Sequence, residues 1–127
     1  MNIILLLGSL IGLSSVMMAA FVDHSLALQL DAKALSAVLT AVRYHQLYAI
    51  LISVIGLLIS LQLNHKMKWW LNLTGFIFII GIFIFSCSIY LRYIFQMTGI
   101  IYFTPSGGLL LMLGWVCLMR TACLMKQ

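Results

Sequence analysis

Charged side chains are scarce in this sequence: they make up 7% of its 127 residues, whereas hydrophobic residues make up 65%. A soluble domain of this length needs far more charge to cover its surface, so a soluble fold is excluded. The net charge of +5 does not indicate a nucleic-acid partner, because the cations are spread along the chain and the charge asymmetry of membrane loops accounts for most of them.

The basic segment that begins a signal peptide is also missing, since only Met1 and Asn2 precede the first apolar run. We therefore expect this run to be retained as a membrane span. Ala19 and Ala20 resemble a cleavage site, and removal of the run is the alternative.

Four long apolar runs, of which this is the first, fill most of the chain, and the first three contain no charged side chain. They predict spans at residues 3–22, 44–63, 69–91 and 105–125, each close to the ~20 residues that a ~30 Å hydrocarbon core requires. We expect one domain, residues 1–127, with an all-α fold of four transmembrane helices in an up-down-up-down bundle. Packing and interhelical hydrogen bonds must hold such a bundle together, because the surrounding lipid is equally apolar.

The lysines and arginines of the connecting segments predict the orientation. The side that holds both termini carries Lys66, Lys68, Arg120 and Lys126, and the opposite side carries Lys33, Arg43 and Arg92. Lys66 and Lys68 lie in the shortest loop, where the positive-inside rule works best. We therefore expect both termini in the cytoplasm.

The segment Ser25–Val42 mixes leucines with polar residues such as Gln29, Asp31 and Lys33. It is too polar to cross a bilayer and too apolar to remain free in water. Two interpretations stay open: an interfacial amphipathic helix, or an amphipathic extension of the second transmembrane helix above the membrane.

Small residues recur along one face of each predicted helix, and Gly8 and Gly12 form a GxxxG motif that allows close helix approach. We interpret these residues as helix-packing positions inside the bundle. The alternative is a seam for a second copy or for a larger complex. The predicted packing residues are Gly8, Gly12, Ser15, Ala19, Ser53, Gly56 and Gly114.

Most of the unusual polar residues should gather at one end of the bundle, away from the termini. Such a concentration in a membrane protein indicates a functional site by default, although it could also simply terminate the helices. The candidate residues are Asp23, His24, Arg43, Tyr44, His45, Ser86, Ser88, Tyr90, Arg92, Thr104, Pro105, Gly107 and Gly108.

The start of the fourth helix is part of this candidate site. Thr104 is a good N-cap residue and Pro105 suits the first turn. The glycines that follow leave backbone N–H groups accessible, which favours an anion site or else an ordinary helix start.

No complete catalytic or metal-binding set is visible. His24, His45 and Cys87 are possible ligands, but a zinc site needs three or four with support around them. A nucleophile at Ser86, Cys87 or Ser88 with a histidine base has no acid partner fixed by spacing. We therefore expect no metal, no cofactor and no enzymatic activity, with a metal- or nucleophile-dependent membrane enzyme as the alternative.

Three segments together resemble a known family. They are Ala19–Leu26, Thr40–Tyr48, and Phe85–Tyr90 paired with Thr104–Gly108 and the dipeptide Gly114–Trp115. These segments are similar to those of the small bacterial inner-membrane proteins of the YgdD type, the domain of unknown function 423. The resemblance implies a four-helix protein of the bacterial inner membrane and implies no activity.

The chain departs from the family pattern at several positions. Tyr48 stands where the family commonly has a histidine, and His45 lies one helical turn earlier, on the same face. Asp23 replaces an alanine, and Cys87 replaces a glycine between two serines.

Two function classes follow. The first is a non-enzymatic accessory or assembly subunit of a larger membrane complex, with other membrane subunits or a second copy as partners in the bilayer. The alternative is a small oligomeric transporter or a lipid- or anion-binding protein, which requires Arg43 or Arg92 to face a cavity.

Overall fold

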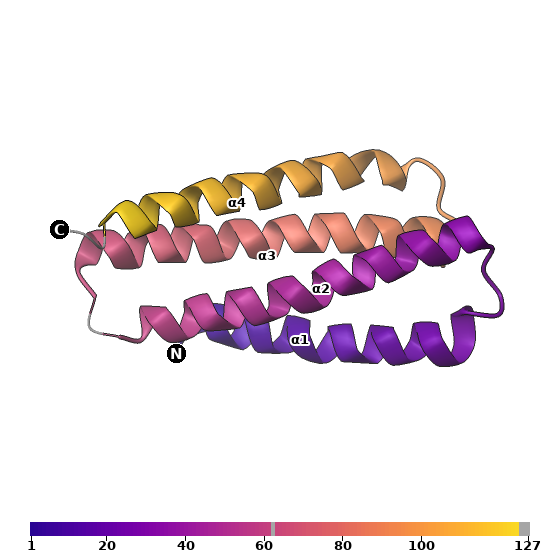
Figure 1. Cartoon of the computed structure of the whole chain (residues 1–127), viewed down its shortest axis with the longest axis horizontal. Helices are drawn as coiled ribbons and strands as arrows, with labels where there is room; N and C mark the ends of the chain where they lie inside the picture. Colours follow the sequence, from indigo (N-terminus) through magenta and orange to yellow (C-terminus); the bar gives the residue numbers. More distant parts are fainter. Residues whose placement is uncertain (62, 125–127) are drawn as a thin grey trace.

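The computed structural model describes residues 1–61 and 63–124, and the regular elements in this part of the chain are all helical (Figure 1). The long helices are α1 (Ile3–Phe21), α2 (Ala32–Ile59), α3 (His65–Tyr93) and α4 (Thr104–Leu124). A π-helical turn, η1 (Val22–Leu26), continues α1, and a 3₁₀ turn, η2 (Ile100–Phe103), leads into α4. The 4 long helices are each long and apolar enough to cross a membrane. The predicted all-α fold with four transmembrane helices is confirmed.

The helices lie side by side in chain order and alternate in direction (Figure 1). Each packs mainly against its neighbour in sequence, and α1 also meets α3 over a smaller area. The start of α1 and the end of α4 lie at one end of the bundle. We call the opposite end, where the α1–α2 and α3–α4 connections lie, the distal end.

Asparagine and aspartate caps determine where three of the helices begin. The Asp31 carboxylate accepts a hydrogen bond from the Ala34 amide at 2.7 Å at the start of α2. The Asn64 side chain accepts one from Met67 at 2.8 Å at the start of α3, and the Asn2 side chain accepts one from Leu5 at 3.0 Å at the start of α1. Such caps satisfy backbone N–H groups that have no partner inside the helix.

The Asp31 cap decides between the two interpretations of the segment 25–42. Residues 32–42 continue directly into α2 as one helix of 28 residues, so the amphipathic segment is an extension of the second transmembrane helix. Helices α2 and α3 are longer than the predicted spans, and α2 begins 12 residues before the predicted start at residue 44. The predicted end of the fourth span at residue 125, and Lys126, lie outside the described residues.

The predicted N-cap role of Thr104 is not what the structure shows. Thr104 already has right-handed helical backbone angles, and its hydroxyl oxygen lies 2.6 Å from the hydroxyl oxygen of Ser88. The η2 turn feeds straight into α4, so the helix has no separate capping residue at this position.

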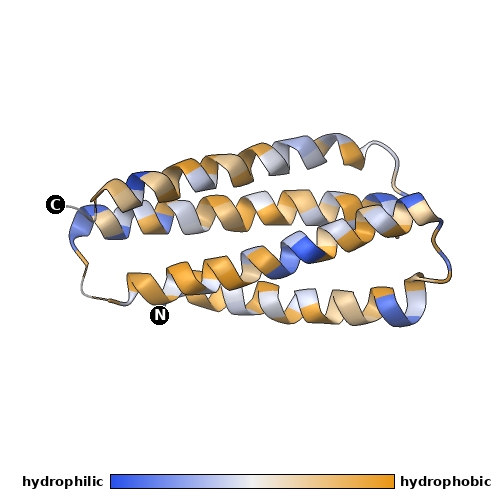
Figure 2. Cartoon of the chain, viewed as in Figure 1, coloured by the Kyte–Doolittle hydropathy of each residue, from blue (hydrophilic) through white to orange (hydrophobic). Residues whose placement is uncertain are grey.

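Two clusters of buried side chains fill the bundle. The first lies in the half nearer the termini and includes Ile52, Phe78 and Leu111. The second lies toward the distal end and includes Val38, Ala41 and Ile89. Figure 2 shows that hydrophobic residues also continue over the outside of the helices, as a lipid-facing surface requires.

Small residues mark the closest approaches between helices. A β-carbon on Gly8 would lie 2.7 Å from the Ser53 hydroxyl oxygen, and one on Gly56 would lie 2.6 Å from the Leu5 amide nitrogen. Close approach of this kind is how helices gain packing energy in a bilayer. Of the other predicted packing residues, Gly12 faces Ala49, Ser15 is buried, Ala19 borders the distal cluster, and Gly114 is pressed against the Phe78 ring.

Candidate functional site

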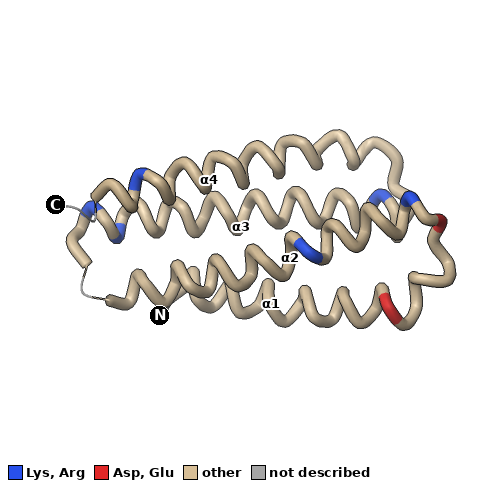
Figure 3. The backbone as a smooth tube through the Cα atoms, in the orientation of Figure 1, with Lys and Arg blue, Asp and Glu red and all other residues tan. Residues whose placement is uncertain are grey.

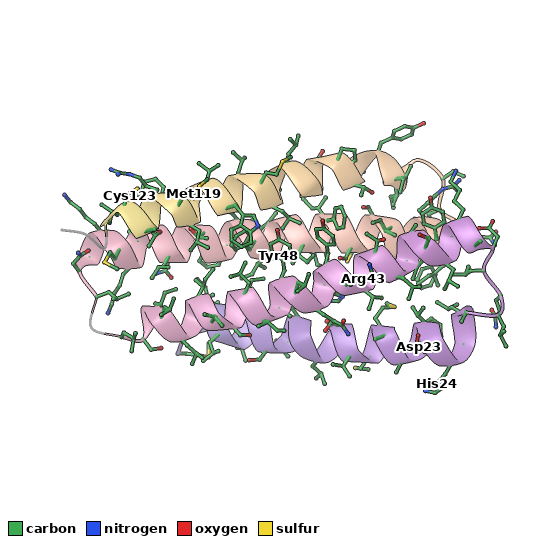
Figure 4. The ribbon with its side chains drawn as sticks, viewed as in Figure 1. Asp23, His24, Arg43, Tyr48, Met119 and Cys123 are labelled. Carbon is green, nitrogen blue, oxygen red and sulfur yellow. The ribbon has the colours of Figure 1, made fainter. Side chains whose placement is uncertain are left out.

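Asp23 and His24 lie in the π-helical turn at the distal end of α1. The Ala27 amide bonds back to the Val22 carbonyl at 2.9 Å, which is the wider spacing of a π turn, a local geometry that often marks functional positions. Both side chains are exposed. His24 points away from the bundle, as Figure 4 shows, so it does not join the other candidate residues.

Arg43 is set deeper than the sequence predicted. Because α2 begins at Ala32, Arg43 lies roughly 16 Å along the helix from its first residue, at 1.5 Å per residue. The side chain is exposed, and the exposed residues one turn before and after it are Leu39 and Leu47. Figure 3 shows most of the cations near the two ends of the molecule and one part of the way along α2, where Figure 4 labels Arg43. Arg43 is therefore a cation on an apolar, lipid-facing surface.

A cavity of about 240 Å³ lies between α1 and α2 beside this arginine. Its lining includes Arg43, Gln46, and Asp23 from the end of α1. The cavity therefore combines a cation, a carboxylate and an amide, with Asp23 nearer to the distal end.

A second hollow continues from this cavity along the α1–α2 seam toward the termini, and we call it the seam furrow. Gln46 lines both. The furrow has a volume of about 580 Å³, and its lining includes Gly8, Gly12, Ala49 and Ser53. The predicted stripe of small residues is thus partly open to the surface of the bundle.

His45, the next candidate, lies on the other side of α2 and has two hydrogen-bond partners. Its Nε2 is 3.2 Å from the Ser14 hydroxyl of α1, and its Nδ1 is 3.2 Å from the Tyr90 hydroxyl of α3. The imidazole thus bridges three helices. Ser14, His45 and Tyr90 also line a groove of about 650 Å³ between α1 and α3.

The two candidate serines of α3 make structural hydrogen bonds. Ser86 donates to the Ala41 carbonyl at 3.2 Å and so joins α3 to α2. Ser88 donates to the Phe85 carbonyl at 2.9 Å. In the hydrogen bond between Ser88 and Thr104, the threonine hydroxyl is then the donor and the serine oxygen the acceptor. These bonds connect α3 to both of its neighbours at the distal end.

The remaining candidates do not gather with these residues. Tyr44 packs between the rings of Tyr48 and Phe85. Arg92 lies with its guanidinium carbon 6.0 Å from the Tyr93 ring centre. Pro105 is exposed, while Gly107 is buried against the Phe85 backbone and Gly108 faces open space. The predicted distal cluster therefore separates into an Arg43 cavity, a His45 groove and a helix-packing region.

Sequence reasoning missed several residues that take part in these features. Ser14 and Gln46 were not singled out, although Gln46 follows Arg43 by three residues and therefore shares its face. The hydrogen bond from the Trp115 indole to the Tyr48 hydroxyl, at 2.8 Å, was also missed. An indole N–H in an apolar environment needs a partner, which is the signal that could have found it.

Comparisons with known proteins place the chain in a family. The family model described as "Protein of unknown function (DUF423)" matches residues 18–108, and no solved structure matches the chain. A UPF0382 membrane protein of Haemophilus influenzae is 33% identical over 92% of this chain and 90% of its own length. One of Staphylococcus haemolyticus is 34% identical over 93% of both chains, and YwdK of Bacillus subtilis is 28% identical over 96% of this chain and 97% of its own. The chain therefore belongs to the DUF423 family of membrane proteins, as its motifs predicted.

Proposed function

We propose that this protein is a non-enzymatic protein of the bacterial cytoplasmic, or inner, membrane that binds a phospholipid headgroup at Arg43. The single observation that carries the proposal is that Arg43 lines a cavity on the lipid-facing surface of α1 and α2. Arg92, the other arginine considered, is half-buried over the Tyr93 ring. An ionised side chain at membrane depth is costly unless it is paired, so it marks a binding position.

The order of charges along the cavity matches a phospholipid. Arg43 lies nearer to the middle of α2, and Asp23 lies nearer to the distal end. In a phospholipid the phosphate lies closer to the hydrocarbon than the terminal headgroup does. The phosphate therefore pairs with Arg43 through charge-assisted hydrogen bonds, and a terminal ammonium or hydroxyl group donates to Asp23. One acyl chain follows the seam furrow.

A second function remains a candidate because of the same furrow. Its small residues, Gly8, Gly12, Ala49 and Ser53, are also the type that lets a helix of another protein approach closely. An accessory or assembly subunit would use the furrow for such a helix, and an acidic residue of the partner would then pair with Arg43.

Mild extraction of the tagged chain, followed by native mass spectrometry, separates these functions. We expect the wild-type protein to retain phosphatidylethanolamine or phosphatidylglycerol and to prefer both over phosphatidylcholine, whose headgroup has no donor. Arg43→Gln should lower retention about tenfold, which corresponds to the loss of one charge-assisted interaction. Arg92→Gln is the matched control and should retain lipid normally.

Gly12→Leu provides a second variant, because its side chain would fill the furrow without touching Arg43. It should lower lipid retention while circular dichroism shows an unchanged helix content. Equal retention by Arg43→Gln and the wild type would overturn the lipid proposal. A stoichiometric membrane subunit that is lost from both variants would establish the accessory-subunit function instead.

A further inference from the structure

The groove between α1 and α3 is a second possible binding site, separate from the Arg43 cavity. It has a volume of about 650 Å³, within the range of about 300–1,000 Å³ typical of small-molecule sites. Its walls include Leu10 from α1 and Ile80 and Phe83 from α3. Among the described residues, no lining residue is shared with the Arg43 cavity or the seam furrow, and none in the groove is an aspartate, glutamate, lysine or arginine.

The polar groups of the groove lie together near its distal part. They are Ser14, His45, Ser86, Cys87 and Tyr90. The apolar residues Leu7 and Ile79 lie further from the distal end, toward the first residues of their helices. An amphiphile in the groove would therefore place its polar end toward the distal end of the bundle and its chain toward the opposite end.

The hydrogen bonds in the groove fix which groups remain free. With the Ser14 proton placed on the Ile11 carbonyl at 2.9 Å, the Ser14 oxygen accepts from Nε2–H of His45. A neutral imidazole has one N–H, and Nδ1 of His45 must then accept the Tyr90 hydroxyl proton. The Ser86 proton is used by the Ala41 carbonyl.

The described residues of the groove therefore present lone pairs and almost no free donors. The Ser14 and Tyr90 oxygens each keep acceptor capacity, while the Cys87 thiol is a weak donor. A ligand that offers only carbonyl oxygens would leave its own acceptors unpaired, which is costly in an apolar medium. A ligand with a hydroxyl group satisfies them.

We propose that the α1–α3 groove binds an uncharged amphiphile with a hydroxyl group, such as a long-chain alcohol or an acylglycerol. The hydroxyl donates to the Tyr90 or Ser14 oxygen, and the alkyl chain lies between Leu10 and Phe83. An anionic headgroup is disfavoured because no arginine or lysine lines the groove. This site goes beyond the phospholipid site at Arg43 and does not depend on it.

Cys87 supplies the readout, because it lines the groove and is a half-buried free thiol. The test uses the full chain with Cys117→Ser and Cys123→Ser, reconstituted in phosphatidylcholine nanodiscs. N-ethylmaleimide modification of Cys87 is followed by intact mass. Oleyl alcohol, methyl oleate and oleate serve as the hydroxyl, carbonyl-only and anionic probes.

We expect oleyl alcohol to slow the modification of Cys87 at least fivefold, and methyl oleate and oleate to have little effect. Tyr90→Phe should remove the protection by removing the acceptor oxygen. Leu10→Trp should remove it by filling the groove from its exposed rim while the hydrogen bonds stay intact. Ser9→Ala, on the other side of α1, is the matched control and should keep the protection.

Arg43→Gln should also keep the protection, so this site and the phospholipid site can fail separately. Equal protection by methyl oleate and oleyl alcohol would overturn the proposal, because it would mean simple filling of an apolar space. Unchanged modification of Cys87 in saturating oleyl alcohol would overturn it as well.

Discussion

Gly107 lies against the backbone of Phe85, so closely that a β-carbon at position 107 would be 2.5 Å from the Phe85 amide nitrogen. The next residue, Gly108, has nothing within 4 Å of the corresponding position. Two consecutive glycines at the start of α4 therefore have different roles: Gly107 sets the distance between α3 and α4, while Gly108 does not.

Gly107→Ala should destabilise the bundle by about 1–3 kcal/mol, because the added methyl group meets backbone that cannot move aside. Gly108→Ala should be neutral or stabilising by up to about 1 kcal/mol, because alanine favours a helix. Unfolding in mixed micelles at increasing SDS fraction, followed by circular dichroism, measures both. Equal effects of the two changes would contradict the packing described here.

The Trp115 indole donates to the Tyr48 hydroxyl and joins α4 to α2 across α3. Tyr48→Phe and Trp115→Phe should each destabilise the protein. A double-mutant cycle should give a coupling free energy of about 0.6 kcal/mol, with about 2 kcal/mol as the upper limit. Tyr44→Phe is a suitable control, since Tyr44 is exposed and packs through its ring. A coupling of zero would mean that the bond contributes nothing.

Asn2 connects the start of α1 to the end of α2. Its side-chain nitrogen donates to the Gly56 carbonyl at 2.6 Å and to the Ser60 hydroxyl at 2.9 Å, while its oxygen caps α1. Asn2→Ala should cost about 1–2 kcal/mol and speed hydrogen exchange at the first amides of α1. Asn72→Ala, which breaks a bond only within α3, should leave that exchange unchanged.

The predicted orientation can be tested without changing any charged residue. Gln29 and His65 are exposed at opposite ends of the bundle, and each can be made the single cysteine in a cysteine-free background. A membrane-impermeant maleimide added to intact cells, or to spheroplasts where an outer membrane is present, should label Gln29→Cys and spare His65→Cys. The reverse pattern would place the termini outside.

The sequence predicted the number of helices, their alternation and the family, because spans without charge and the family motifs are local signals. It did not predict how deep Arg43 and His45 lie. Their depth depends on where α2 begins, and the Asp31 cap determines that start. Their separation onto different sides of α2 depends on which face meets α1 and which meets α3. Hydropathy cannot give that information, because apolar residues lie on every face of these helices, at buried and exposed positions alike.

The position of Arg43 also affects the bilayer itself. Water and lipid headgroups must move into the bilayer to solvate a guanidinium that lies between Leu39 and Leu47 on an exposed face. We therefore expect a thinner hydrocarbon layer along the α1–α2 side of the molecule than along α4, where exposed side chains such as Leu109, Met112 and Val116 are apolar. Uneven thickness around one small protein costs energy that neighbours can relieve. This asymmetry would give the protein a preferred side for meeting other membrane components.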